Sequence, residues 1–212
     1  MGHSQPQTRG IVIHSDRAYD VTFGRLIRTT DAEILARAGV ASGDRVLDVG
    51  TGPGYLALAA SKLVGLDGGA VGIDASAEMI ARARILAARR GSHADYVVAS
   101  AEALPFGEAS FDVAVSRLVF HHLPGDVKTK ALAEIARVLK PGGRLVLVDL
   151  ASATAQGAHH LLARVLGRRP HTGAALEELI AGAGFTQLTR GRLAHGLLAG
   201  VAARAPERSA DG

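Results

Sequence analysis

Residues 45–54 read RVLDVGTGPG, a short strand-like run that leads directly into a glycine-rich loop. The ten residues that follow, YLALAASKLV (55–64), have the apolar content of a buried helix. Glycines at such a junction permit positive φ angles and let a ligand approach the backbone closely. A strand, a glycine loop and a helix in this order are typical of the first unit of a nucleotide-binding α/β domain.

Outward from this unit, strand-like and helix-like segments alternate along the chain. Ser76 is a typical N-cap for the helix after the second strand, and Pro141-Gly142-Gly143 is expected to end a later helix and lead into the fifth strand. This alternation indicates βαβ units, and we predict a single doubly wound α/β domain with a mostly parallel sheet. Strands are predicted at 45–49, 70–74, 95–98, 111–115, 144–149, 185–191 and 197–203, and helices at 15–38, 55–64, 77–90, 126–139 and 174–183.

Composition limits the chemistry that this domain can carry. The 212 residues include no cysteine, which excludes disulfides, a thiolate nucleophile and cysteine-ligated metal centres. The net charge of +4 comes from basic residues that are spread along the chain, so we expect no nucleic-acid partner. The first residues lack an apolar signal segment, and no run reaches the roughly 18 apolar residues of a membrane span, so we expect a cytoplasmic protein.

An acidic residue closes the second predicted strand. Asp74 lies where a carboxylate can accept the hydroxyls of a ribose in nucleotide-binding folds. The glycine spacing differs from a dinucleotide fingerprint, because Tyr55 stands at the third small-residue position and Gly54 comes one residue early. We therefore predict nucleoside binding without a pyrophosphate site. The alternative interpretation is a structural turn beside a solvated aspartate.

Four segments in this order resemble class I S-adenosylmethionine-dependent methyltransferases, and most of all the small group that includes the ubiquinone/menaquinone-biosynthesis enzymes. The resemblance covers roughly residues 10–204. It implies a Rossmann-like, mostly parallel seven-stranded sheet with an antiparallel last strand. It also implies S-adenosylmethionine as the cofactor and methyl transfer to a small, hydrophobic acceptor. The segments are VLDVGTGPGYLALAA (46–60), VGIDASAEMIARAR (71–84), ASAEALPFGEASFDVAVSRLVFHHL (99–123) and ALAEIARVLKPGGRLVLVD (131–149).

The same resemblance implies roles for individual residues. Asp74 would hold the ribose hydroxyls, and Tyr19 would close over the carboxylate of the cofactor. Ser100 stands where the family commonly has an aspartate for the adenine amino group, so an uncharged hydroxyl replaces a charged acceptor there. Tyr19 as an anchor of the first helix and Glu102 as a loop charge are the alternatives. The implied cofactor-binding residues are Tyr19, Asp48, Gly50, Gly52, Gly54, Asp74, Ala75, Ser100, Ala101, Glu102, Ser116 and Arg117.

Two histidines follow the fourth predicted strand. His121 and His122 are the candidate catalytic residues, because a neutral imidazole suits a general base near neutral pH. The alternative is that one histidine packs on the following helix and the other is solvated. A second pair, His159-His160, has no carboxylate at a ligand-like spacing nearby, so no metal site is predicted.

The segment 151–172 is long for a connection between strand and helix, whose usual length is about 2–6 residues. We expect it to form a lid over the acceptor, with a short apolar helix at 161–166 and with Arg168-Arg169 at its end. The apolar face of this helix favours a small-molecule acceptor such as a quinone precursor, a lipid or a polyketide-like product. The sequence also leaves open whether the protein forms a homodimer. The expected organisation is a helical covering segment (1–43), a methyltransferase domain (44–204) and a tail (205–212).

Three other interpretations stay open at this point. The chain can be a cofactor-binding protein of the same fold with a non-methylating role, since its binding motifs are clearer than its catalytic ones. A nicotinamide-dependent oxidoreductase is disfavoured by Tyr55 and the early Gly54. An RNA or protein methyltransferase is disfavoured because the sequence shows neither an appended recognition domain nor an Asn/Asp-Pro-Pro-Tyr signature.

Overall fold

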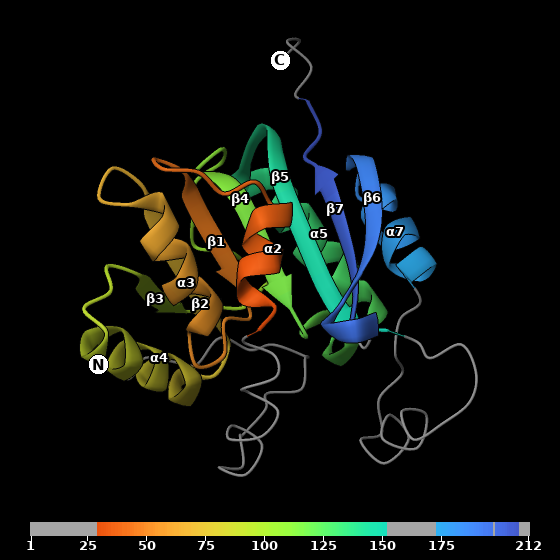
Figure 1. Cartoon of the computed structure of the whole chain (residues 1–212). Coiled ribbons are helices and arrows are strands. Elements are labelled where there is room, and N and C mark those ends of the chain that lie inside the picture. The colour runs from red at the N-terminus through yellow and green to blue at the C-terminus, as the bar shows by residue number, and fades with distance from the viewer. Residues whose placement is uncertain (1–28, 152–172, 197, 208–212) are drawn as a thin grey trace.

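The computed structural model describes residues 29–151, 173–196 and 198–207. Within them lies a seven-stranded sheet in the order β3-β2-β1-β4-β5-β7-β6 (Figure 1). The first five strands pair in parallel, and β7 pairs antiparallel with both of its neighbours, as predicted. The strands are β1 (Arg45–Val49), β2 (Gly69–Asp74), β3 (Asp95–Val98), β4 (Phe111–Arg117), β5 (Leu139–Leu150), β6 (Thr186–Leu193) and β7 (Leu198–Arg204).

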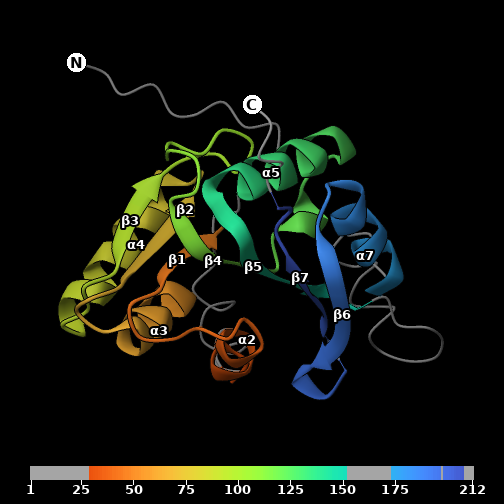
Figure 2. The same cartoon turned by 90° about the horizontal axis from the view of Figure 1, so that it is seen from above.

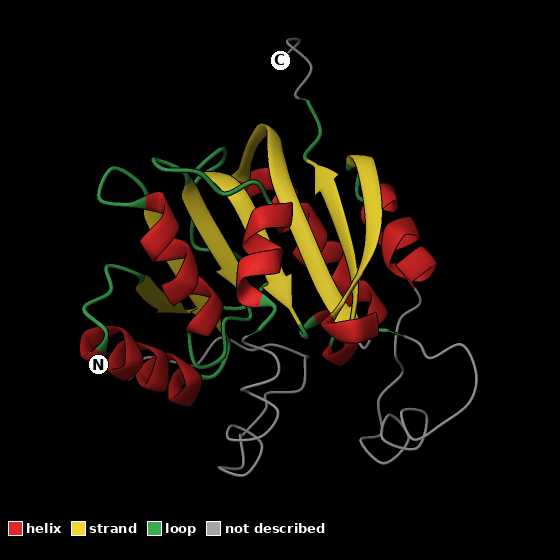
Figure 3. Ribbon diagram, viewed as in Figure 1, coloured by secondary structure: helices red, strands yellow, loops and turns green. Residues whose placement is uncertain are grey.

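Helices cover both faces of this sheet, so the domain has three layers (Figure 3). Seen from above, α5 and α7 lie on one face, and α2 and α3 lie on the other (Figure 2). Two short 3₁₀ helices, η1 and η2, follow β4 and β6. The helices are α2 (Asp31–Arg37), α3 (Tyr55–Val64), α4 (Ala77–Arg89), α5 (Gly125–Val138) and α7 (Gly173–Gly182), with η1 at Phe120–His122 and η2 at Ala194–Gly196.

The core is divided into two clusters by the sheet. Leu47 and Val49 of β1 pack with Ile135 of α5, whereas Val46 packs with Leu56 of α3 in the other cluster. Alternate residues of one strand therefore enter opposite layers, as the period of two in a β-strand requires. Burial on both faces explains why the parallel strands read as nearly continuous apolar runs.

Local sequence signals agree closely with the observed boundaries. The helix α3 and the strands β1 and β3 have the predicted limits, and β2, β4, β6, β7, α4, α5 and α7 differ from theirs by one or two residues. The start of β5 differs by five residues, at Leu139 instead of Arg144. The side chain of Ser76 accepts a hydrogen bond from the Met79 N–H at 3.3 Å, which confirms the predicted N-cap of α4.

The prediction for Pro141-Gly142-Gly143 was wrong. The helix α5 ends at Val138 and β5 begins at Leu139, so the three residues lie inside the strand instead of preceding it. Leu139 pairs with Phe111, and the register then shifts before Val113. A proline, which has no N–H to donate, is tolerated at such an irregularity. The run therefore bends the start of β5 and does not terminate the helix.

Several sequence predictions fall outside the described residues. They are Tyr19, most of the predicted helix at 15–38, His159-His160, Arg168-Arg169 and nearly all of the lid. At the other end of the chain, Ala205 is buried and donates its N–H to the Gly143 carbonyl at 2.7 Å, so packing continues past β7. Among the helices of the described ranges, none has the length and apolar content to cross a membrane.

Candidate active site

The residues that the sequence implied and that the structure describes gather at one edge of the sheet. The arrowheads of β1 and β4 point to the same edge, whereas that of β7 points to the opposite one (Figure 1). The chain order reverses between β1 and β4, and ligands of open α/β sheets bind at the carboxyl ends of strands near such a reversal. The glycine loop follows β1, Asp74 ends β2, Ser100 follows β3 and Ser116 lies near the end of β4.

Asp48 is a buried carboxylate that fastens the glycine loop to α3. Its Oδ2 accepts hydrogen bonds from the Thr51 hydroxyl at 2.6 Å and from the Ala57 N–H at 3.1 Å. Burial raises the pKa of Asp48 to about 6, although the Thr51 hydrogen bond and the charge of Arg117 act in the opposite direction. Asp48 thus stabilises the conformation of the glycine loop.

The raised pKa of Asp48 predicts a pH-dependent stability. The folded protein holds the Asp48 proton more tightly than the unfolded chain, whose pKa is near 3.8, so the free energy of unfolding falls as pH rises from about 4 to 6. The expected loss is about 3 kcal/mol, at 1.36 kcal/mol for each pKa unit. Urea unfolding at a series of pH values, without cofactor, measures it in the wild type and in Asp48→Asn.

Asp48→Asn should lack this loss of unfolding free energy. The contributions of the other titrating groups are the same in both proteins and cancel in the comparison. Asp95→Asn, at an exposed position in β3, serves as the control and should follow the wild-type curve. Parallel curves for the wild type and Asp48→Asn across this pH range would contradict the assignment.

The three glycines of the loop have positive φ angles for different reasons. Their φ angles are 73°, 53° and 88° at Gly50, Gly52 and Gly54. A Cβ on Gly50 would lie 2.2 Å from the Val119 side chain, and one on Gly54 would lie 2.7 Å from both Ala83 and Tyr96. A Cβ on Gly52 would meet no described atom within 4 Å. Packing therefore requires the outer two glycines, and the middle one faces space that a ligand can enter.

Asp74 joins the glycine loop to the turn before α4. Its Oδ2 accepts the Gly52 N–H at 3.0 Å and its Oδ1 accepts the Ser76 N–H at 2.9 Å. Burial raises the pKa of Asp74, while both backbone hydrogen bonds lower it. A carboxylate offers about four acceptor sites, so each oxygen keeps one for an incoming hydroxyl. This geometry fits the vicinal hydroxyls of a ribose beside the open face of Gly52.

The segment after β3 adds a second polar group to this edge. Ser100 is buried, and its carbonyl accepts the Ala103 N–H at 3.2 Å. Ala101 is half-buried beside it. The Glu102 Oε2 atom is buried and has no hydrogen-bond partner among the residues that the structure covers. An acceptor in this state calls for a donor, so Glu102 is not simply a solvated loop charge.

Ser116 and Arg117 use their side chains within the protein. The Ser116 hydroxyl donates to the Val49 carbonyl at 2.9 Å, which ties β4 to β1. The Arg117 guanidinium binds the Thr30 hydroxyl at 3.2 Å and forms an ion pair with Asp31 of α2. The Arg117 contacts hold α2 against the end of β4. The backbone groups of Ser116 and Arg117 are therefore the atoms that could contact a cofactor.

The chain makes an unusual turn directly after Arg117. Leu118 has a φ of 60°, a left-handed conformation that is uncommon for a residue other than glycine, and its N–H donates to the Val148 carbonyl at 2.8 Å. The turn brings Val119 against Gly50 and then starts η1. Backbone strain of this kind concentrates at functional sites.

The two predicted histidines have different surroundings in the structure. The His121 Nδ1 atom lies 2.5 Å from the Asp149 Oδ1 atom, and the His121 N–H donates to Asp149 Oδ2 at 2.7 Å. Both side chains are almost fully buried, at 1% and 0% exposed. The His122 ring lies beside that of His121, with centroids 3.8 Å apart. Asp149 was not predicted as a site residue, although an acid at the carboxyl end of the apolar run RLVLVD was a signal for it.

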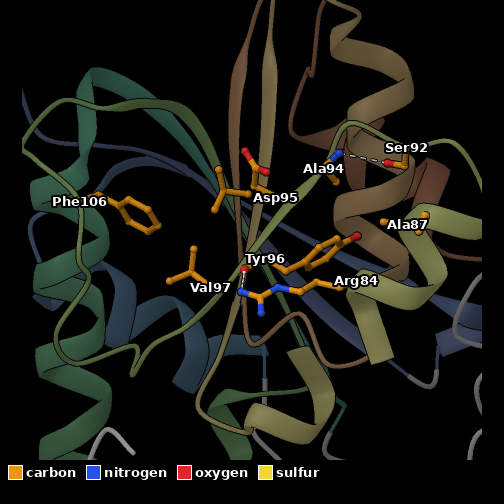
Figure 4. Close-up of a pocket in the computed structure, with 10 residues that line it drawn as sticks. Arg84, Ala87, Ser92, Ala94, Asp95, Tyr96, Val97 and Phe106 are labelled. Carbon is orange, nitrogen blue, oxygen red and sulfur yellow. Dashed lines mark hydrogen bonds between the residues drawn. The ribbon is translucent and has the colours of Figure 1, made fainter. Parts of the chain in front are cut away.

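A separate cavity of about 600 Å³ lies along the edge strand β3 (Figure 4). Phe106 and Val97 lie on one side of the strand, and Tyr96 and Arg84 lie on the other, where the Arg84 guanidinium donates to the Tyr96 carbonyl at 2.7 Å. The cavity includes none of the site residues predicted from the sequence. In the described part of the chain, no group of three or more histidines and acids is placed to hold a metal ion.

This sheet order, with the glycine loop after β1 and an acid at the end of β2, defines the class I S-adenosylmethionine-dependent methyltransferase fold. Residues 46–143 match the family model described as "Methyltransferase domain". The match spans 98 of the 212 residues of the chain.

Curated relatives have the same class of name. The chain is 43% identical over 106 residues to "Uncharacterized methyltransferase YcgJ" of Bacillus subtilis, which is 50% of this chain and 40% of that protein. It is 35% identical over 132 residues to the ubiquinone/menaquinone biosynthesis C-methyltransferase UbiE of Marinomonas sp., which is 61% of this chain and 52% of that protein. The chain spans about half the length of these relatives.

Solved structures agree on the fold. A SAM-dependent methyltransferase from Aquifex aeolicus superposes with a TM-score of 0.70 at 23% identity, covering 82% of this chain and 89% of the other. The [4+2]-cyclase SpnF superposes with a TM-score of 0.71 at 21% identity, covering 94% of this chain and 87% of the other. A methyltransferase and a cyclase thus share one fold, so function depends on the site.

Proposed function

We propose that this protein transfers a methyl group from S-adenosylmethionine to a small, hydrophobic acceptor. The observation that carries the proposal is the edge formed by Gly52 and Asp74, where an open backbone face lies beside a carboxylate with spare acceptor sites. A Lys-Ser/Thr phosphate loop is missing from the sequence, which favours a nucleoside without a pyrophosphate. The names of the relatives support the same activity.

When bound, S-adenosylmethionine would supply a methyl group on a sulfonium centre. The protein's part is to bind the nucleoside, align the acceptor and exclude water. Asp74 would hold the ribose hydroxyls, and Gly52 would admit the methionine part. Ala75, Ser100, Ala101 and Glu102 would border the adenine. Asp48, Gly50 and Gly54 would hold the glycine loop in the shape that the cofactor needs. Ser116 and Arg117 would contact the cofactor through their backbone groups, and Tyr19 would cover its carboxylate.

We also propose that the methyl acceptor binds beside this edge of the sheet. The segments 1–43 and 151–172 would form it together with η1, since the methyltransferase core fills residues 44–149. The names of the UbiE relatives point to quinone-type molecules as the first acceptors to examine. A cytoplasmic location, the lack of a nucleic-acid partner and the oligomeric state stay predictions from the sequence.

Ligand binding and methyl transfer test the proposal together. Isothermal titration should show S-adenosylhomocysteine binding and no NAD binding. Radiolabelled S-adenosylmethionine should then transfer its methyl group to 1,4-naphthohydroquinone, a reduced quinone with free ring positions. Tight NAD binding without S-adenosylhomocysteine binding would overturn the proposal in favour of an oxidoreductase.

A non-methylating role at the same site is the second candidate, and the fold match to the cyclase SpnF favours keeping it. In that case S-adenosylhomocysteine would bind, and no label would move to any acceptor. The two measurements therefore separate all three functions.

A further inference from the structure

We propose, on the basis of the proposed function, that His121 is the general base that deprotonates the methyl acceptor and that Asp149 positions it. The acceptor is then a molecule that attacks through a hydroxyl group, of the phenol, hydroquinone or enol type. His122 has no part in the proton transfer.

The hydrogen bonds of Asp149 determine which nitrogen of His121 can act. The carboxylate accepts from His121 at both the backbone N–H and the ring Nδ1, and it also accepts the Leu150 N–H at 2.8 Å. A carboxylate is an acceptor, so the proton of a neutral ring lies on Nδ1. The Nε2 atom is then left with its lone pair, in the form that a base requires.

The Nε2 atom of His121 is buried and has no hydrogen-bond partner within the described ranges. A purely structural link between η1 and β5 accounts for the contacts of Nδ1 and of the backbone. It does not account for an unpaired buried nitrogen, which is unfavourable and uncommon in folded proteins. An acceptor hydroxyl that donates to Nε2 would satisfy it.

The location of η1 brings the segment that carries His121 against the glycine loop. Val119, two residues before His121, packs against the backbone of Gly50 in the glycine loop. The left-handed Leu118 makes this approach possible, because it turns the chain directly after β4. The turn that carries the base therefore rests on the loop that the cofactor would use.

Charged and aromatic groups from three described elements face the His121 ring or its partner. Asp149 comes from β5, the tilted His122 ring lies beside the His121 ring in η1, and Lys128 of α5 interacts electrostatically with Asp149. Burial lowers the pKa of Lys128, while the charge of Asp149 raises it. An imidazolium formed at His121 would lie directly against the Asp149 carboxylate, which stabilises it as the acid of a catalytic triad does.

The step balances without any further reagent. The Nε2 lone pair of His121 takes the hydroxyl proton, the acceptor forms its new bond to the methyl carbon, and the electrons of the broken C–S bond stay on sulfur. His121 ends as an imidazolium and later releases its proton to water. A carboxylate or thiolate acceptor would need no base, whereas a hydroxyl acceptor has a proton that the His121 Nε2 atom can take.

The tautomer of His121 tests the pair without an acceptor. In ¹⁵N-labelled protein with S-adenosylhomocysteine, long-range ¹H–¹⁵N spectra should show a protonated Nδ1 and an unprotonated Nε2. Asp149→Asn should move the proton to Nε2, because an amide can donate to Nδ1. Asp95→Asn, at an exposed site in β3, should leave the pattern unchanged. A protonated Nε2 in the neutral wild-type ring, or a tautomer unaffected by Asp149→Asn, would overturn the proposal.

Kinetics with 1-naphthol as the hydroxyl probe and benzoate as the base-independent probe test the catalytic role. Asp149→Asn and His121→Asn should lower kcat for 1-naphthol by about 10²–10⁴-fold, with KM for S-adenosylmethionine unchanged. Asp149→Glu should recover part of the rate and the acid limb of the pH profile. Transfer to benzoate alone, equal rates in Asp149→Asn and Asp95→Asn, or a loss confined to His122→Asn would each contradict it.

The two proposals fail in distinguishable ways. Protein that binds S-adenosylhomocysteine yet transfers to neither probe nor to 1,4-naphthohydroquinone would count against the proposed function. The tautomer measurement would still decide whether Asp149 sets the His121 ring, and S-adenosylhomocysteine binding by each variant shows that it has folded.

Discussion

Replacing Asp74 with alanine should weaken S-adenosylhomocysteine binding at least tenfold. The variant loses an acceptor for the ribose hydroxyls, and each hydrogen bond to a charged group is worth about 1.5–3 kcal/mol. One such bond already corresponds to about a tenfold change in the dissociation constant. Isothermal titration measures the loss, with Asp67→Ala as a matched control at an exposed turn.

Asp74 also accepts the Gly52 N–H, so part of the loss can arise from the loop. A double-mutant cycle separates the two effects, using S-adenosylhomocysteine and its 2′-deoxy analogue with the wild type and with Asp74→Ala. The wild type should prefer the hydroxylated ligand, and the variant should bind both alike. If the variant keeps the full preference, the ribose assignment is wrong.

Replacing Gly54 with alanine should lower the free energy of unfolding by about 2–5 kcal/mol. A left-handed conformation costs a residue with a Cβ about 1–2 kcal/mol, and overpacking a core adds about 1–3 kcal/mol. The new Cβ would lie 2.7 Å from Ala83 and from the Tyr96 ring. Tyr96 cannot easily move away, because its hydroxyl donates to the Gly54 carbonyl at 2.9 Å and only 4% of the residue is exposed.

Gly52→Ala is the matched control for this prediction. Its φ of 53° also imposes the left-handed cost, but no described atom lies within 4 Å of the added Cβ. The expected loss is therefore about 1–2 kcal/mol. Urea unfolding of both variants without cofactor gives the comparison. Equal losses would show that the packing against Ala83 and Tyr96 does not require Gly54.

Much of the fold could be predicted from local patterns. The residues 55–64 form a helix and 45–49 a strand because apolar spacing and flanking glycines act over a few residues. Ser76 caps α4 for the same reason, since an N-cap hydrogen bond spans three residues. The misassigned residues at 141–143 show the limit of such signals. There, the pairing of Leu139 with Phe111 extends β5 past residues that usually end an element.

The candidate site, too, could be predicted from the sequence only in part. The glycine loop and Asp74 are visible in the sequence because each follows directly from the end of a strand. The reasons for the individual glycines are not visible, since Val119 meets Gly50 from 69 residues away and Tyr96 meets Gly54 from 42 residues away. The ion pair of the Arg117 side chain with Asp31 of α2 is likewise not visible in the sequence, because the two residues lie 86 residues apart.

The sequence by itself determined the order of strands and helices, the glycine loop and the acid after the second strand, because backbone propensity and turn chemistry act between near neighbours. The tertiary structure alone decided that Asp149 binds His121. His121 and Asp149 lie 28 residues apart and meet because β4 and β5 are adjacent in the sheet. Adjacent parallel strands bring their carboxyl ends to one edge, and no local pattern can specify which side chains meet there.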